Sequence, residues 1–190
     1  MNKDIIIFGT SPYINEISDL IPRLQKKYIN VGINCFPVFY PEVNHWFFYD
    51  DDMIKIIGDS RYKGQKLWAR KGLKGHLQLL QIENYEIFQP VDNQFFLEDN
   101  GKLLFNNFTI TIVLNWCYVK GFKNVYLAGV DMDSENWFHF YDLNNAHFVH
   151  HKRLNEVMKW IYDIQEYLNI YQLNPGNTTK LPKREVKTLI

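Results

Sequence analysis

The chain has 190 residues, 46% of them hydrophobic and 22% charged, a composition typical of one globular domain with a substantial buried core. Its 21 basic and 21 acidic residues give a formal net charge of zero, which argues against a broad basic surface for duplex nucleic acid. The sequence contains no run of about 18 apolar residues, so we expect no transmembrane segment.

The first predicted element is a strand over residues 4–10. Its centre, IIIF, is apolar without alternation and so suits burial on both faces. The residues GTSP at 9–12 then form a strand-to-helix junction, in which Thr10 or Ser11 can cap the helix. Apolar residues recur at helical spacing as far as Lys27, which predicts a helix after this junction.

Two further strands are predicted over residues 30–36 (NVGINCF) and 45–50 (HWFFYD). Residues 53–83 are predicted to be mostly helical or irregular. Within them, residues 61–74 (RYKGQKLWARKGLK) form a local basic cluster. We interpret this cluster as a solvated face or loop, and a local basic groove is the less favoured alternative.

The middle of the chain predicts another strand over residues 85–89 (YEIFQ) and a short hairpin over 93–104, with its turn at DNG. A buried helix is predicted over residues 108–120, followed by a strand over 124–129. Gly121 separates the two and ends the helix.

The last third of the chain begins with a predicted polar, aromatic loop over residues 132–146. A long amphipathic helix is predicted from about His147 to Leu168, because apolar residues recur on one of its faces. A final strand over residues 169–173 and an exposed basic tail over 177–190 complete the chain.

The alternation of strands and helices predicts a Rossmann-like three-layer α/β/α sandwich with a mainly parallel sheet. We expect a single nucleotide-binding domain over residues 1–176, with the basic tail over 177–190 outside it. In such sheets ligands bind beyond the carboxyl ends of the strands. Gly129 and Asp131 therefore lie at the predicted rim of a site, and the turn at 9–12 repeats this arrangement.

The two cysteines, Cys35 and Cys117, lie far apart in apolar runs. We expect buried thiols in a reducing compartment rather than a disulfide or a metal site. No signal peptide is recognisable at the start of the sequence. These features predict a cytoplasmic protein. They leave the oligomeric state open, a homo-oligomer included.

The junction of Gly9, Thr10 and Ser11 is a candidate phosphate site. Free N–H groups and the dipole at a helix start can hold a phosphate. The residues match neither a Walker motif nor G-x-G-x-x-G, so a plain structural turn is an equal alternative.

Histidines cluster at HFVHH, residues 147–151. In a helix His147 and His151 share a face, because they are four residues apart. No HExxH glutamate lies between them and no thiol lies nearby, so a general base with an orienting partner fits better than a metal pair. A solvated helix start is the alternative.

Aspartates follow two of the predicted strands. The run Asp50 to Asp52 contains the D-x-D pattern with which some glycosyltransferases hold a divalent ion on a sugar diphosphate. This makes Asp50 and Asp52 a minor candidate for a metal site, and an exposed turn is the main alternative. Asp131 and Asp133 are similarly placed, with capping of a turn or helix as their alternative role.

Taken in order, the motifs resemble those of the small bacterial lipooligosaccharide sialyltransferases of glycosyltransferase family 42. They are more distantly similar to Rossmann-like proteins related to motility accessory factors. The matching blocks are IIIFGTSPY at 5–13, VGIN at 31–34, WFFYD at 46–50, GFKNVYLAGVD at 121–131, HFVHH at 147–151 and NIYQLNPG at 169–176. They span nearly the whole chain, and the 121–131 block is the most distinctive.

The resemblance implies a glycosyltransferase that moves a sugar, sialic acid or a related one, from a CMP-linked or other nucleotide donor. The acceptor would be a saccharide or another hydroxyl, and no cofactor beyond the donor is implied. His151 would be the base that deprotonates the acceptor, and Thr109 would lie near the donor's phosphate or sugar. Four residues would surround the nucleotide, namely Gly9, Thr10, Asn34 and Asp50.

The sequence departs from the family pattern at several positions. Ser11, Tyr13, Asp50 and Asn106 replace a glycine, a serine, an asparagine and an arginine. Asp133 stands in place of a tyrosine on the leaving phosphate, for which Tyr141 is the candidate substitute, and the segment from Asp131 to His147 is shorter than the family's lid. Two alternatives stay open: a non-catalytic nucleotide- or partner-binding protein, and a metal-dependent phosphate-handling enzyme.

Overall fold

The computed structural model describes residues 4–58, 62–106, 108–132, 136–148, 151–176 and 179–190. The side chains of residues 136–137, 143–148 and 151 lie outside that description. Within the described ranges, no helix combines the length and the apolar character needed to cross a bilayer.

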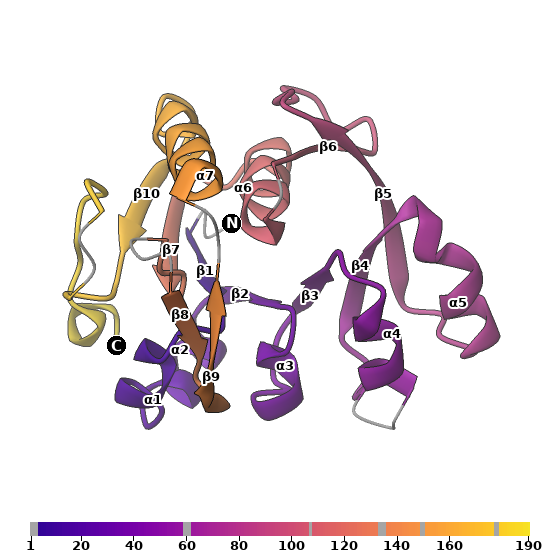
Figure 1. Cartoon of the computed structure of the whole chain (residues 1–190), viewed down its shortest axis with the longest axis horizontal. Helices are drawn as coiled ribbons and strands as arrows, with labels where there is room; N and C mark the ends of the chain where they lie inside the picture. Colours follow the sequence, from indigo (N-terminus) through magenta and orange to yellow (C-terminus); the bar gives the residue numbers. More distant parts are fainter. Residues whose placement is uncertain (1–3, 59–61, 107, 133–135, 149–150, 177–178) are drawn as a thin grey trace.

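Eight strands form the main sheet, and all of their pairings are parallel. The strands are β1 (Asp4–Phe8), β2 (Ile29–Ile33), β3 (His45–Phe48), β4 (Lys66–Arg70), β5 (Tyr85–Asp92), β6 (Lys102–Phe105), β7 (Asn124–Ala128) and β10 (Asn169–Gln172). Their order across the sheet is β10-β7-β1-β2-β3-β4-β5-β6. The chain thus builds outward from β1 to β6 and then returns to place β7 on the other side of β1, as Figure 1 shows.

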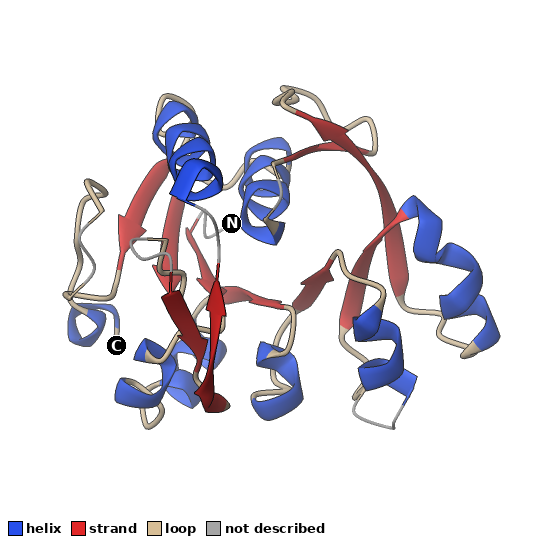
Figure 2. Ribbon diagram, viewed as in Figure 1, coloured by secondary structure: helices blue, strands red, loops and turns tan. Residues whose placement is uncertain are grey.

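Helices cover both faces of the sheet (Figures 1 and 2). One face carries α1 (Tyr13–Glu16), α2 (Ile21–Lys27), α3 (Phe36–Phe39), α4 (Asp52–Ile56) and α5 (Lys74–Leu79), and the other carries α6 (Thr109–Val119) and α7 (His151–Ile164). Two short 3-10 helices are η2 (Lys71–Leu73) and η3 (Val186–Leu189). This arrangement confirms the predicted three-layer α/β/α sandwich.

Alternate residues of the central strands supply the two halves of the core. In β1, Ile5 and Ile7 pack in the cluster that contains α6 and α7, whereas Ile6 and Phe8 pack in the cluster on the opposite face. All four side chains are fully buried. Burial on both faces explains why β1 is uniformly apolar and why it could be predicted from sequence.

Strand β4 is the element missed by the prediction that residues 53–83 are mostly helical or irregular. Leu67 and Ala69 of this strand are buried, and Lys66 and Arg70 form ion pairs with Glu86 and Asp51. The basic residues therefore alternate with core residues in a central strand. Trp68 packs against the core cluster on the opposite face, so this strand is not part of a solvated loop.

Strand β6 corrects a second prediction, that of a hairpin over residues 93–104. The turn residue Gly101 does have a positive φ of 75°, but β6 then pairs with β5 in parallel. A parallel pair requires a crossover connection and excludes a hairpin.

Residues 132–146 also differ from the predicted loop. They contain most of a separate antiparallel hairpin, formed by β8 (Asn136–His139) and β9 (Asp142–Phe148). Because β9 continues through Phe148, α7 begins at His151 and not at about His147. His147 therefore lies in a strand, and the predicted helical face shared by His147 and His151 is wrong.

Two smaller differences concern the ends of the chain. The helix predicted to reach Lys27 is two helices, α1 and α2, separated by a turn over residues 17–20. The tail predicted to be exposed is partly buried, because Leu181, Val186 and Leu189 contribute to the core. It runs beside β10, with a parallel bridge between Gln172 and Lys183.

Candidate functional site

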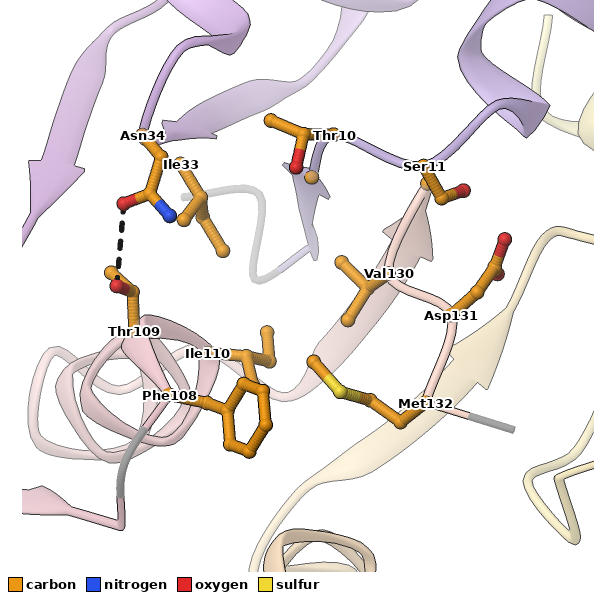
Figure 3. Close-up of a pocket in the computed structure, with 12 residues that line it drawn as sticks. Thr10, Ser11, Ile33, Asn34, Phe108, Thr109, Ile110, Val130, Asp131 and Met132 are labelled. Carbon is orange, nitrogen blue, oxygen red and sulfur yellow. Dashed lines mark hydrogen bonds between the residues drawn. The ribbon is translucent and has the colours of Figure 1, made fainter. Parts of the chain in front are cut away.

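A pocket of about 70 Å³ opens at the carboxyl ends of β1, β2 and β7 (Figure 3). It lies where the strand order reverses, since β1 has β2 on one side and β7 on the other. Ligands of open α/β sheets bind at such switch points. The lining consists of Gly9, Thr10, Ser11, Ile33, Asn34, Phe108, Thr109, Ile110, Gly129, Val130, Asp131 and Met132. We call it the switch-point pocket.

The turn after β1 is joined directly to the end of β7. The Gly9 N–H donates to the Ala128 carbonyl oxygen at 2.8 Å, and the Ser11 N–H donates to the Gly129 carbonyl oxygen at 3.0 Å. A Cβ on Gly9 would lie only 2.2 Å from that Gly129 oxygen. Glycine at position 9 therefore permits contact between two backbone segments, and two N–H groups of the turn are unavailable to a phosphate.

The backbone of Asn34 is held in place by two hydrogen bonds at the edge of the pocket. It follows β2 with a positive φ of 51°, a left-handed conformation that asparagine adopts more readily than most non-glycine residues. Its N–H donates to Phe47 O at 2.9 Å, and its carbonyl accepts from Trp46 Nε1 at 2.7 Å.

The side chain of Asn34 is fixed by the opposite wall. Thr109 Oγ1 donates to Asn34 Oδ1 at 3.3 Å, the bond drawn in Figure 3. The amide nitrogen, Nδ2, has no acceptor among the described residues, and Figure 3 shows it on the pocket side of the side chain. Asn34 therefore presents a preoriented hydrogen-bond donor to a ligand.

The start of α6 supplies further donors. This helix has 11 residues, and Phe108 at its N-cap is extended, with φ −134° and ψ 137°. The first N–H groups of a helix have no acceptor within it and, with the helix dipole, favour an anion. Thr109 and Ile110 lie in this first turn and line the pocket. The start of α6 is thus better suited to a phosphate than the turn at residues 9–12.

Asp131 lines the pocket, but its carboxylate is engaged elsewhere. Oδ1 accepts from Gln172 Nε2 at 3.1 Å, and Oδ2 accepts from Asn174 Nδ2 at 3.0 Å. In Figure 3 the carboxylate points away from Asn34 and Thr109. The Ser11 hydroxyl is buried in the same wall without a hydrogen-bond partner in the described part of the chain. Asp131 therefore ties the end of β7 to the end of β10.

Asp50 follows β3 and does not line the switch-point pocket. Partial burial, followed by the neighbouring Asp52 and Asp51 carboxylates, raises its pKa. Asp51 is paired with Arg70, and Asp52 lies 3.9 Å from Lys55 Nζ. Throughout the described residues, no group of three or more His, Cys, Asp or Glu side chains is arranged to hold a metal ion.

The tip of the β8–β9 hairpin contacts the turn after β1. The Phe140 N–H donates to Thr10 O at 2.8 Å, and His139 Nδ1 lies 2.8 Å from Thr10 Oγ1. His139 was not among the predicted site residues, although the aromatic-rich NWFHFYD around it is typical of a strand. Because the hairpin was predicted as a loop, this contact could not be anticipated.

Tyr141 lies outside the pocket lining, beside the hairpin tip. Its ring stacks on those of His139 and Phe39, with centroid separations of 4.8 and 5.3 Å. Burial raises the pKa of its hydroxyl, with a further contribution from Cys35. Tyr141 is therefore a neutral phenol within an aromatic stack.

The two predicted catalytic histidines are placed only by their backbone. His147 lies in β9, and His151 is the first residue of α7. Both side chains lie outside the described part of the structure, as does Asp133. Asn106, where the resembled sialyltransferases have an arginine, is buried and donates to Asn93 Oδ1 at 2.8 Å.

Comparison with known proteins gives a fold. No protein-family model matches the sequence, and no curated protein matches it significantly. The chain resembles the monofunctional alpha-2,3-sialyltransferase Cst-I from Campylobacter jejuni, with a TM-score of 0.55 and 16% identity over 97% of this chain and 81% of that one. The sialyltransferase CstII from the same organism, solved with the substrate analogue cytidine-5'-monophosphate, gives a TM-score of 0.56 and 12% identity over 96% and 85%. The resemblance inferred from sequence is confirmed at the level of the fold.

Proposed function

We propose that this protein is a glycosyltransferase whose switch-point pocket holds the phosphate of a nucleotide sugar, in its most specific form CMP-linked sialic acid or a related sugar. One observation carries the proposal: the free amide of Asn34 and the start of α6 converge on a pocket at the β1/β7 switch point. Both groups donate hydrogen bonds, and neither carries a net charge.

The volume of the pocket bears on which part of the donor it holds. About 70 Å³ is far less than the roughly 300–1,000 Å³ of a site for a whole small molecule. The space suits a phosphate group. The nucleoside and the sugar would extend from it across the rim of the sheet.

The chemistry required of the protein is limited, since a nucleotide phosphate is already a competent leaving group. A base removes the proton of the acceptor hydroxyl, whose oxygen bonds to the anomeric carbon as the bond from that carbon to the phosphate oxygen breaks. We assign the base to His151, with His147 as its neighbour, and such a base contributes roughly 10²–10⁴-fold. Asn34 and the start of α6 would stabilise the negative charge on the departing phosphate.

Calorimetric titration with CMP, UDP, GDP and ATP, with and without Mn²⁺, tests this assignment. Metal-independent binding of CMP supports the sialyltransferase-like form. Binding that needs Mn²⁺ would instead favour Asp50 and Asp52. If no nucleotide binds at millimolar concentration, the proposal is wrong.

Turnover of a CMP-linked sugar then tests the base. His151→Ala should abolish transfer while leaving the affinity for CMP nearly unchanged. His76→Ala is the matched control, because His76 is exposed on α5, remote from the pocket lining. Transfer at the wild-type rate by the His151→Ala protein would remove His151 from the mechanism.

A second candidate function, nucleotide binding without transfer, is favoured by one specific observation. The N–H groups of Gly9 and Ser11 are bonded to Ala128 and Gly129, so this turn offers fewer donors to a phosphate. A protein that binds CMP but neither transfers nor hydrolyses a CMP-linked sugar would have this function.

A further inference from the structure

A second and larger pocket lies between the C-terminal segment and the end of β10. Its volume is about 530 Å³, within the range of sites that hold small molecules. Tyr13, Leu173 and Val186 form its apolar wall, and each of these side chains is less than a tenth exposed. We call this cavity the basic pocket because of its remaining lining.

The charges on its lining are mostly positive. Three cationic residues, Lys183, Arg184 and Lys187, line the pocket, and Glu185 is the one acidic residue in its lining. This local excess occurs in a chain whose formal net charge is zero. Within the described ranges, none of the three cations forms an ion pair.

The cations keep most of their hydrogen-bonding capacity. Lys183 Nζ donates to Pro175 O at 2.9 Å, which uses one of the three donors of an ammonium group. The Arg184 guanidinium lies 4.9 Å from the centroid of the Tyr171 ring, a contact that orients the group without using its N–H donors. A guanidinium held in this way can bind a phosphate or carboxylate through two parallel hydrogen bonds.

The walls of the basic pocket are fixed by backbone hydrogen bonds. The Gln172 N–H donates to Pro182 O at 2.8 Å, and the Arg184 N–H donates to Gln172 O at 3.0 Å. Tyr13 Oη donates to Leu173 O at 2.9 Å. Burial, and then the charges of Glu16 and Asp131, raise the pKa of Tyr13 to about 12, so this wall adds no negative charge near neutral pH.

The basic pocket adjoins the switch-point pocket without sharing a lining residue. Asn174, between Leu173 and Pro175, donates to the Asp131 carboxylate that lines the other pocket. Tyr13 likewise lies two residues beyond Ser11. One wall thus separates two cavities at the same edge of the sheet.

We propose that the basic pocket is a binding site for a small organic anion, which it recognises through a phosphate or carboxylate group held by Arg184 and Lys187. The apolar wall packs against the uncharged part of the ligand. This proposal does not depend on the function of the switch-point pocket.

Calorimetry with glucose 6-phosphate, glucuronate and glucose tests the proposal. We expect at least one of the two anions to bind and neutral glucose not to bind. If only glucose 6-phosphate binds, the preferred group is a phosphate, and if only glucuronate binds, it is a carboxylate. If neither anion binds, or if glucose binds as well as they do, the proposal is overturned.

A pair of matched double variants locates the site. Arg184→Gln with Lys187→Gln should weaken anion binding about tenfold or more, as expected for loss of one charge-assisted hydrogen bond. Lys71→Gln with Lys74→Gln makes the same change in net charge on exposed residues outside the lining and should have no effect. Equal affinities in the two variants would overturn the assignment.

Two measurements on the unaltered protein guard against a variant that fails to fold. Amide NMR shifts of residues 183–187 should move during titration with the anion, whereas no movement there would contradict the site. Saturating CMP should leave the anion affinity unchanged, and competition would show that both ligands occupy one pocket. Failure of CMP to bind would affect only the proposed function, since the anion titration stands without it.

Discussion

The two pockets at the carboxyl edge of the sheet differ in volume and in the groups that they would offer to an anion. The switch-point pocket holds about 70 Å³ and offers neutral donors, the amide of Asn34 and the first turn of α6. The basic pocket holds about 530 Å³ and offers three cationic side chains. The switch-point pocket, which lies where the sequence predicted a site, is thus the smaller of the two.

The difference in volume arises from how closely neighbouring backbone segments approach each other around each pocket. At the switch point, Gly9 allows the turn after β1 to bond to the end of β7, which fills space and uses two N–H groups. Beside β10, the C-terminal segment forms backbone hydrogen bonds with Gln172. The basic pocket then lies between this segment and Tyr13. A position at strand ends therefore identifies where a ligand can bind, but the contacts between loops decide how much space remains.

The largest effect should follow from preventing the close approach at Gly9. Gly9→Ala places a Cβ 2.2 Å from Gly129 O, so we expect the free energy of unfolding to fall by about 3 kcal/mol in urea titration. Gly75→Ala is the control, since no atom lies within 4 Å of its added Cβ and alanine favours a helix by about 0.5–1 kcal/mol. Equal stability of the two variants would contradict the described contact.

Lowering the pH should have the next largest effect on the free energy of unfolding. The two pockets can be compared only at a pH at which the protein stays folded. Burial, and then the charges of Lys66 and Lys120, lower the pKa of His45 from 6.5 to about 4. As the pH falls, His45 is therefore protonated in the unfolded chain before it is protonated in the folded one. The free energy of unfolding should fall by at most about 3 kcal/mol between pH 6.5 and pH 4.

His45→Gln should remove this component of the pH dependence, since the amide keeps an acceptor for Trp68 Nε1, which lies 3.3 Å from His45 Nδ1. His76→Gln, at an exposed position, should retain it. Urea titrations of both variants across the same pH range give the free energy of unfolding at each pH. If this free energy depends on pH in the His45→Gln protein as it does in the wild type, the assignment is refuted.

Nucleotide affinity should respond to the donor at Asn34. Asn34→Asp keeps the size of the side chain but replaces Nδ2 with a charged oxygen, so we expect CMP affinity to fall about ten- to a hundredfold by calorimetry. Asn93→Asp is matched to it, because Asn93 also has a positive φ, 55°, and lies outside the pocket lining. An equal loss in both variants would point to a general effect on folding.

The smallest effect should be a difference in salt dependence. Between ionic strengths of about 0.01 M and 0.15 M the Debye length falls from about 30 Å to 8 Å. Anion binding at exposed Lys187 and Arg184 should therefore weaken several-fold, and CMP binding should weaken less. If the affinities for glucose 6-phosphate and CMP depend equally on ionic strength, the electrostatic distinction between the two pockets is wrong.

Sequence patterns predicted the elements that are buried on both faces. Residues 5–8 of β1 and 125–128 of β7 are continuous apolar runs, and both strands were predicted from this character. Strand β4 was missed because Lys66 and Arg70 gave its segment a basic composition, although Leu67 and Ala69 preserve the period of two. The same effect hid the C-terminal segment, whose buried Val186 and Leu189 are interspersed among charges.

The sequence predicted which strand ends would come together, but not the contacts between them. Strand ends identify Gly9, Asn34 and Gly129, which the structure places around one pocket. The hydrogen bonds that occupy Gly9 and Asp131 could not be read from the sequence, because their partners lie far away in the chain. Asp50 lies outside the lining, since β3 is not adjacent to the switch point.

The contact between Gln172 and the C-terminal segment has a further consequence at the border of the sheet. Strand β10 is one of the two outermost strands, and its outer N–H and C=O groups would otherwise be a template for another chain. Pro182 and Arg184 occupy the backbone groups of Gln172, so the segment caps this border. The segment that contributes Arg184 to the basic pocket therefore also covers part of this exposed edge.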